Sequence, residues 1–186
     1  MDIAELKAEL EQHHAACFSW ALSCCARDRG EAEEVLQTVY LKILEGKACF
    51  RGEASLKTWL FAVIRKTAIG EHRKNLLRKL RWSDPADQSK QQASLSDEPG
   101  VALEKSETQA LFQTALRTLP RRQREALHLV FYQDLSLSEA AVVMGISIGS
   151  ARQHYERGKK HLRESLGQTE LAYGIAWRGK ENPGAV

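Results

Sequence analysis

Long apolar runs are missing from this chain of 186 residues. No stretch approaches the ~18 consecutive apolar residues of a membrane-spanning helix, and the N-terminus is acidic where a secretory signal needs a positive segment. No pattern pairs a nucleophile with a base, forms a glycine-rich phosphate loop, or sets two carboxylates for acid and base catalysis. We therefore expect a soluble, cytoplasmic protein that is not an enzyme and uses no cofactor.

Cysteine is scarce and confined to the first quarter of the chain. The four residues are Cys17, Cys24, Cys25 and Cys49. Two adjacent cysteines are poor disulfide partners, so reduced thiols are expected. With His13 and His14 nearby, these thiols raise the alternative of a metal or thiol sensor, but no CxxC pair or matching histidine spacing accompanies them. We expect no metal site.

Excess charge of one sign is also small, since the net charge is +3. Its distribution along the chain is uneven. From Met1 to Glu45, nine acidic residues face four Lys or Arg, whereas from Arg65 to Arg81 seven Lys or Arg face a single Glu. The first segment repels phosphate and the second attracts it, so the middle of the chain is a candidate for nucleic-acid contact.

Neither internal repeats nor alternating strand patterns are present, and helical periodicity dominates. The first third of the chain predicts helices at Ile3–Ala26 and Glu31–Leu44, followed by a long helix that Ser55 caps. Between Trp82 and Gly100, Ser, Asp and Pro replace the apolar pattern, as is typical of a linker. We expect an all-α fold of two small helical domains joined by a flexible linker. Their ranges are 1–81 for the first domain, 82–100 for the linker, 101–166 for a four-helix second domain, and 167–186 for a tail without an assigned role.

Helix start and stop signals are dense between Leu119 and Leu166. Pro120 suits the first position of a helix, where its missing N–H costs nothing. The apolar residues that follow at helical spacing are Ala126, Leu127, Val130 and Phe131. Ser136 and Glu139 then form a capping box, which predicts a second, short helix.

Gly145 follows that short helix and supplies the sharp turn that a helix-turn-helix needs. Ser147 caps a last helix of about Ile148 to Leu166. The apolar side of this helix consists of Ile148, Ala151, Tyr155 and Leu162. Its polar side includes Ser150, Arg152, Gln153, Glu156, Arg157 and Lys160. The pattern predicts a recognition helix for the DNA major groove, with a solvated basic helix as the alternative.

Two separated sets of motifs carry a family resemblance. In the first domain they are Ala32-Glu33-Glu34-Val35-Leu36-Gln37, Phe50-Arg51-Gly52 and Thr58-Trp59-Leu60-Phe61. In the second they are Leu119-Pro120, Arg124, Leu135-Ser136, Glu139-Ala140-Ala141 and Gly149-Ser150. In their order and spacing, nearly the whole chain resembles a bacterial RNA polymerase sigma factor of the extracytoplasmic-function (ECF) group of the sigma-70 family. The resemblance implies a transcription-initiation subunit whose partners are core RNA polymerase, promoter DNA and an anti-sigma factor.

The resemblance assigns core-polymerase binding to the second helix. The candidate residues are Leu36, Gln37, Tyr40, Leu41 and Lys42. Such a mixture of aromatic, aliphatic and polar side chains is typical of protein interfaces. The alternative is burial in the three-helix core of the first domain, and both hold if the helix uses two faces.

The resemblance also assigns binding and melting of the minus-ten promoter element to the segment from Phe50 to Lys74. The candidates are Phe50, Arg51, Glu53, Ser55, Lys57, Trp59, Lys66, Arg73 and Lys74. The first five would receive a flipped base, and the last three would follow the phosphate backbone. For Trp59, stacking on a base and packing in the core remain equal alternatives, because large aromatics at helical spacing often belong to the core.

The polar side of the last helix would read the minus-thirty-five element. Arg152 and Arg157 can offer bidentate hydrogen bonds to guanine, and Gln153 to adenine. A stand-alone helix-turn-helix regulator that binds duplex DNA without polymerase is the main alternative. Burial of both arginines, or fusion of the two domains with the Phe50 loop sealed, would contradict the hypothesis of two modules that grip separate stretches of promoter.

Overall fold

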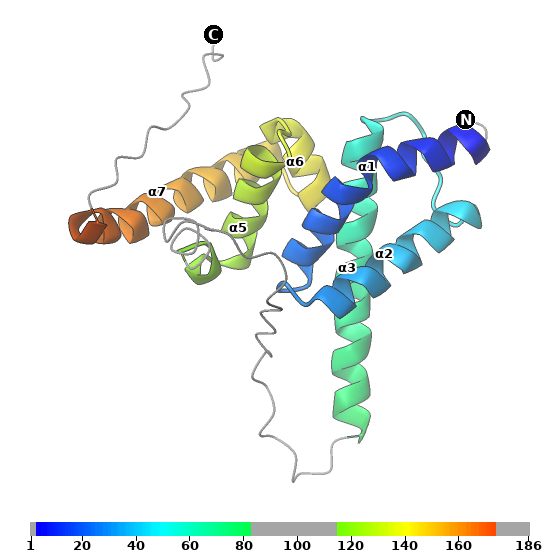
Figure 1. The fold of residues 1–186 in the computed structure, drawn as a ribbon, viewed down its shortest axis with the longest axis horizontal. Helices are drawn as coiled ribbons and strands as arrows, with labels where there is room; N and C mark the ends of the chain where they lie inside the picture. Colours follow the sequence, from blue (N-terminus) through cyan, green and yellow to red (C-terminus); the bar gives the residue numbers. More distant parts are fainter. Residues whose placement is uncertain (1–2, 83–114, 174–186) are drawn as a thin grey trace.

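The computed structural model describes residues 3–82 and 115–173, and every regular element in these ranges is helical. The first module packs three helices together (Figure 1), namely α1 (Ile3–Cys24), α2 (Arg29–Leu44) and α3 (Leu56–Trp82). The second module contains α5 (Arg121–Leu127), the π-helical turn η1 (His128–Tyr132), α6 (Leu137–Met144) and α7 (Ile148–Tyr173). The all-α expectation is confirmed. The expected linker after Trp82, the first part of the second domain up to residue 114, and the tail beyond Tyr173 lie outside the described residues.

Side-chain caps fix where the helices begin. Asp28 accepts a hydrogen bond from the backbone N–H of Glu31 at 2.9 Å, so α2 starts two residues earlier than the periodicity predicts. Ser55 caps α3 in the same way, since its Oγ accepts from the N–H of Thr58 at 3.2 Å. Each cap satisfies an N–H group that the first turn of a helix leaves unpaired.

The capping box at the start of α6 is confirmed. The N–H of Glu139 donates to Ser136 Oγ, and the Glu139 carboxylate accepts from the N–H of Ser136 at 3.0 Å. Gly145 ends α6 with a φ of 63°, the left-handed region that favours glycine. Ser147 Oγ then accepts from the N–H of Ser150, which caps α7. The predicted helix-turn-helix is therefore present.

A π-helical turn interrupts the first predicted helix of the helix-turn-helix, whose apolar residues were expected at regular helical spacing from Pro120 to Phe131. After Leu127 the backbone widens into η1, and the shift changes which side chains point inward. Leu129 is fully buried, whereas Phe131 is 40% exposed, so the predicted place of Phe131 on the apolar side is wrong. Such single π turns insert one residue into the helical register, which simple periodicity does not anticipate.

The two modules share one buried core. Trp20 and Phe61 of the first module belong to the same cluster of buried side chains as Leu129 and Met144 of the second. The Trp20 ring lies 5.4 Å from the His128 ring of η1, measured between ring centroids, and α6 packs against α3. The sequence predicts the two modules but not this packing between them.

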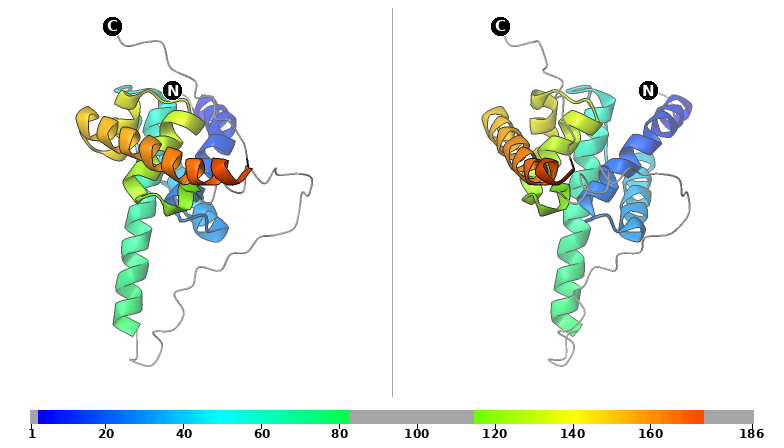
Figure 2. Two further views of the ribbon diagram at one scale, coloured as in Figure 1. Left: turned by 90° about the vertical axis from the view of Figure 1, so that its left-hand side faces the viewer. Right: turned by 60° about the vertical axis from the view of Figure 1, so that its left-hand side comes forward.

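The second half of α3 extends away from the other helices in all the views of Figures 1 and 2. At the opposite end of the chain, α7 continues past its predicted end near Leu166 to Tyr173. None of the described helices is long and apolar enough to cross a membrane.

Candidate nucleic-acid interface

The Phe50 loop has exposed residues next to a pair of aromatic rings. Arg51 and Glu53 are exposed, and Gly52 between them has a φ of 75°, which the left-handed turn requires. The rings of Phe50 and Trp59 lie 5.5 Å apart at an angle of 57°, and both are only partly buried. The loop therefore places the exposed cationic side chain of Arg51 next in sequence to the first of two partly exposed aromatic rings.

The first turn of α3 lies directly against the second module. Lys57 Nζ donates to the backbone oxygen of Gln133 at 2.6 Å, and its ammonium group also lies 5.7 Å from the centre of the Phe61 ring. The hydroxyl groups of Ser55 and Thr58 donate to Glu139 Oε1 at 3.4 and 3.1 Å. These donors are therefore already satisfied within the chain.

The carboxylate of Glu139 collects hydrogen bonds from both modules. The backbone N–H and the hydroxyl of Ser136 are the main cause of its lowered pKa, and the hydroxyls of Thr58 and Ser55 lower the pKa further. Because each of these donors favours the charged form, Glu139 is an anion at neutral pH.

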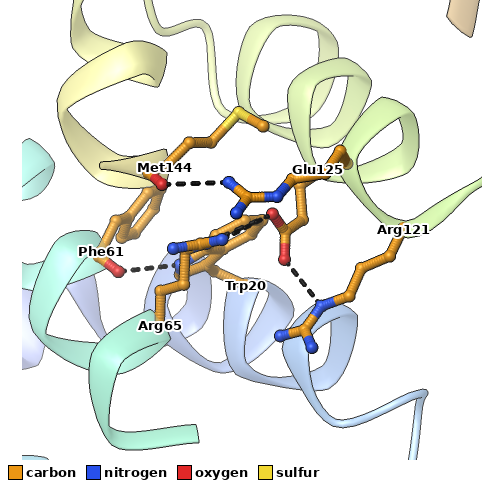
Figure 3. A network of polar contacts seen from close by, with 7 residues as sticks. Trp20, Phe61, Arg65, Arg121, Glu125 and Met144 are labelled. Carbon is orange, nitrogen blue, oxygen red and sulfur yellow. Dashed lines mark hydrogen bonds and ion pairs between the residues drawn. The ribbon is translucent and has the colours of Figure 1, made fainter. Parts of the chain in front are cut away.

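A buried ion pair joins the modules deeper in the interface (Figure 3). Arg65 of α3 donates through Nε and Nη2 to Glu125 Oε2 of α5 at 3.2 and 3.1 Å, and their side chains are 11% and 2% exposed. The other oxygen of Glu125 accepts from Arg121 Nε at 2.9 Å. Sequence reasoning missed this pair, although a charged residue beside the apolar Ala126 and Leu127 is a signal of a buried partner.

Of the basic candidates on α3, Arg73 and Lys74 lie on the projecting second half, and Lys66 lies before it. Lys66, Arg73 and Lys74 are exposed, and Lys74 pairs with Glu71 of its own helix at 2.8 Å. Arg65 belongs to the same basic stretch in sequence but is buried at the module interface. The basic stretch begins at Arg65 in the sequence, but its exposed positive charge begins one residue later, at Lys66.

The start of α7 displays the predicted polar side to solvent. Arg152, Gln153, Glu156, Arg157 and Lys160 are exposed, and Ser150 is partly buried. On the opposite side Ala151 and Leu162 are buried, and Tyr155 is partly buried. Ile148 is 51% exposed, so its predicted inward position is wrong, because the first residue of α7 lies beyond the packed part of the helix.

The candidate polymerase-binding residues divide between two sides of α2. Leu36 is buried in the core at 3% exposure, so for this residue the alternative of core packing holds. Gln37 and Leu41 are exposed. Tyr40 and Lys42 are partly buried, with the Tyr40 hydroxyl 3.0 Å from His14 Nδ1 and Lys42 Nζ donating to Thr67 Oγ1 at 3.3 Å.

An open groove runs along this part of the first module. Its lining consists of Lys7, Leu10, Glu11, His14, Tyr40 and Leu44. Leu44 is 51% exposed and Leu41, on the same helix, is 58% exposed. Large exposed apolar side chains that gather on one surface are typical of protein-binding sites.

The thiols do not form a metal-binding cluster in the described part of the chain, where no group of three or more possible ligands comes together. All four cysteines are free. Burial raises the pKa of Cys17 to about 12 and that of Cys25 to about 11, and it raises the pKa of Cys24 even further. These groups are packing side chains in their thiol form, whereas Cys49 is exposed.

Comparison with known proteins agrees with this arrangement. Residues 10–78 match the family model of sigma-70 region 2, and residues 109–162 match that of sigma-70 region 4. The chain is 31% identical to the ECF RNA polymerase sigma factor SigX of Bacillus subtilis, over 75% of this chain and 73% of the relative. It is 33% identical to the ECF RNA polymerase sigma factor SigF of Caulobacter vibrioides, over 74% of this chain and 72% of the relative.

Among solved structures, the sigma factor RpoE of Bartonella quintana, crystallised with the anti-sigma factor NepR, matches with a TM-score of 0.72 and 27% identity. The match covers 89% of this chain and 98% of RpoE. The helix-turn-helix, the basic α3 and the Phe50 loop thus lie in two regions with the order found in sigma factors. The chain belongs to the ECF RNA polymerase sigma factors of the sigma-70 family.

Proposed function

We propose that this sigma factor binds core RNA polymerase through α2, reads the minus-thirty-five element with α7, and captures the opened minus-ten strand with the Phe50 loop and α3. The observation that carries the proposal is the exposed row of Arg152, Gln153 and Arg157 on a helix that a complete helix-turn-helix holds in place. The protein has no catalytic role in this proposal, since it positions DNA and polymerase.

Recognition by α7 is tested with Arg152→Ala. A good bidentate contact is worth about 1–3 kcal/mol of discrimination against a wrong base, so the variant should lose about 5- to 150-fold in preference for its upstream element. Arg163→Ala is a matched control, because Arg163 is exposed on the same helix but lies eleven residues, about 16 Å, further along. Electrophoretic competition between holoenzymes on wild-type and mutated elements measures the preference, and an unchanged preference for Arg152→Ala contradicts the assignment.

Strand capture at the minus-ten element depends on Phe50 and Trp59 in this proposal. Stacking of a base on an aromatic ring is worth about 1–3 kcal/mol, comparable to the cost of unstacking a base from duplex DNA. Capture of a few bases therefore drives opening without ATP. Trp59→Ala should reduce run-off transcription on duplex promoters much more than on templates with a premelted minus-ten region, and an equal loss on both templates would contradict a role in melting.

Association with core polymerase separates the proposal from a stand-alone regulator. We expect the purified chain to form a holoenzyme with the core RNA polymerase of its own bacterium and to start transcripts at defined sites on a panel of promoter fragments. Leu41→Arg should weaken assembly, because Leu41 is among the most exposed apolar side chains of α2. Tight duplex binding with neither polymerase association nor transcripts would favour the regulator.

An anti-sigma partner is part of the proposal. Support comes from the RpoE match, since that sigma factor was crystallised with the anti-sigma factor NepR. A cytoplasmic location follows from the proposed partners, because polymerase and promoter DNA are there in bacteria. Co-expression of the chain with the products of its neighbouring genes, followed by transcription assays, tests for such an inhibitor.

A further inference from the structure

Three leucine side chains in the second half of α3 are exposed to solvent. Leu76 is 47% exposed, Leu77 60% and Leu80 69%, and Leu80 is the most exposed large apolar side chain in the described part of the chain. This half of the helix extends away from the other helices in Figures 1 and 2. Single exposed apolar side chains are ordinary on a protein surface, but three that gather together indicate a binding site.

The spacing of the three leucines places them on one side of the helix. With 3.6 residues per turn, positions 76, 77 and 80 span an arc of about 100°. An apolar face of about this width is the one by which an amphipathic helix usually packs on a protein core. Here the face is open to water, and because covering it would be favourable, the helix has a surface that suits an apolar partner.

Basic side chains border the leucines. The exposed cations described in this half are Arg73, Lys74 and Arg78. Arg73 lies three and four residues before Leu76 and Leu77, so it is on the same side of the helix one turn earlier. From Arg73 to Arg81 the sequence has five Lys or Arg and no acidic residue. The partner of this face should therefore be negatively charged as well as apolar.

An anionic lipid surface has both properties, whereas the DNA backbone has only one. Phosphates of DNA pair with the cations but gain nothing from the exposed leucines. A bilayer places acidic headgroups directly above hydrocarbon, and basic amphipathic helices lie in this zone with their apolar face immersed by about 5–10 Å. The long stems of Lys and Arg allow their charges to remain at the headgroups while neighbouring leucines enter the acyl boundary.

We propose that the second half of α3 binds the surface of membranes that contain anionic phospholipids, with Leu76, Leu77 and Leu80 at the acyl boundary and the basic side chains at the lipid phosphates. The helix lies on such a surface, since none of the described helices is long and apolar enough to cross a bilayer. This site goes beyond the proposed function and does not rest on it. It predicts that the free chain binds anionic vesicles and that the leucines contribute to the affinity.

The test compares the full-length wild-type chain with Leu77→Ala/Leu80→Ala, which removes two exposed leucines and leaves every charge in place. Alanine retains the helix because it has the highest helix propensity. Leu41→Ala/Leu44→Ala is the matched control, because it removes two similarly exposed leucines, 58% and 51%, from α2. If far-UV circular dichroism shows that the first double variant does not fold, the single variant Leu80→Ala replaces it.

Vesicle flotation measures the affinity. The vesicles contain phosphatidylglycerol and phosphatidylethanolamine in equal parts, and vesicles of phosphatidylcholine alone are the uncharged comparison. Wild type should bind the anionic vesicles and not the uncharged ones. Leu77→Ala/Leu80→Ala should bind the anionic vesicles at least about 10-fold more weakly, whereas Leu41→Ala/Leu44→Ala should bind like the wild type.

The charge contribution is tested in the same assay with Arg78→Gln. One cation near an anionic membrane surface changes the affinity about 5-fold, so this variant should bind the anionic vesicles about 5-fold more weakly than the wild type. Arg29→Gln is its control, because Arg29 is an exposed arginine on α2, where it pairs with Glu33. Arg29→Gln should bind like the wild type.

Wild type that binds neither kind of vesicle, or both equally, overturns the proposal. A folded leucine variant that binds anionic vesicles as tightly as the wild type also overturns it, because the binding would then be adsorption by charge alone. If the wild type does not bind vesicles but Leu77→Ala/Leu80→Ala weakens holoenzyme assembly, the face binds polymerase and the lipid assignment is wrong. Transcription by the wild-type holoenzyme tests the proposed function separately.

Discussion

Among the described glycines, Gly158 of α7 has the closest neighbours, and these belong to α5. A Cβ atom at position 158 would lie 3.0 Å from Leu127 Cδ1, 3.1 Å from Leu127 Cγ and 3.3 Å from Gln123 Cβ. Leu127 is buried at 1% exposure and packs in a cluster with Leu119 and Leu162, so it has little room to move. We expect Gly158→Ala to force the two helices apart.

The magnitude follows from two opposing terms. Alanine gains about 0.5–1 kcal/mol over glycine inside a helix, whereas an extra methyl group in a packed core costs about 1–3 kcal/mol. Gly167→Ala is the control on the same helix, because a methyl group at position 167 would have no neighbour within 4 Å and only the helical gain remains. The two variants should therefore differ by about 1–3 kcal/mol in the free energy of unfolding.

Urea unfolding followed by far-UV circular dichroism measures this difference. With an m-value of about 2 kcal/mol per molar urea, the two midpoints should lie about 0.5–1.5 M apart, with Gly158→Ala the lower. Gly158→Ala should also weaken binding to the minus-thirty-five element, since α7 would tilt on α5. If both alanines raise the midpoint equally, Leu127 yields and the spacing of the two helices is not fixed by this glycine.

Three further predictions concern caps, pH and thiols. Ser136→Ala should destabilise the chain by about 1 kcal/mol in urea unfolding because the α6 cap is lost, whereas Ser136→Asn should largely retain stability; equal losses contradict this. Burial lowers the pKa of His128 from 6.5 to about 4, so the free energy of unfolding should be highest above pH 6.5 and should fall as the pH drops toward 4. His128→Phe should flatten this part of the pH profile, and an unchanged profile would contradict the burial of the imidazole. Under native conditions a thiol reagent should modify Cys49 rapidly and the other three cysteines only on unfolding; fast reaction of Cys17 would show that the core opens.

Local chemistry made much of the fold predictable. The Ser136 capping box, the Gly145 turn and the Ser55 cap each depend on residues within three or four positions, and the structure has all three. The π turn η1 was not predictable in this way, because its register depends on how Leu129 packs against the first module. The same tertiary packing explains why the predicted placement of Phe131 on the apolar side was wrong.

The candidate site, like the fold, was predictable where it depends on local sequence and not where it depends on tertiary packing. Exposure of Arg152 and Arg157 could be read from helical spacing, whereas the partners of Lys57 and Arg65 could not. Those partners lie 76 and 60 residues away in sequence, and only the packing of two modules brings them together. A single sequence carries no periodic signal for such a contact.

The two carboxylate oxygens of Glu139 accept hydrogen bonds from different modules. Oε2 accepts from the N–H and the hydroxyl of Ser136, while Oε1 accepts from Ser55 and Thr58 across the interface. Undocking of the modules would vacate only Oε1, and the bonds that start α6 would survive. Helix α6 therefore keeps its capping box when the contact with the first module breaks, so this contact can be made and broken repeatedly without melting the helix that bears it.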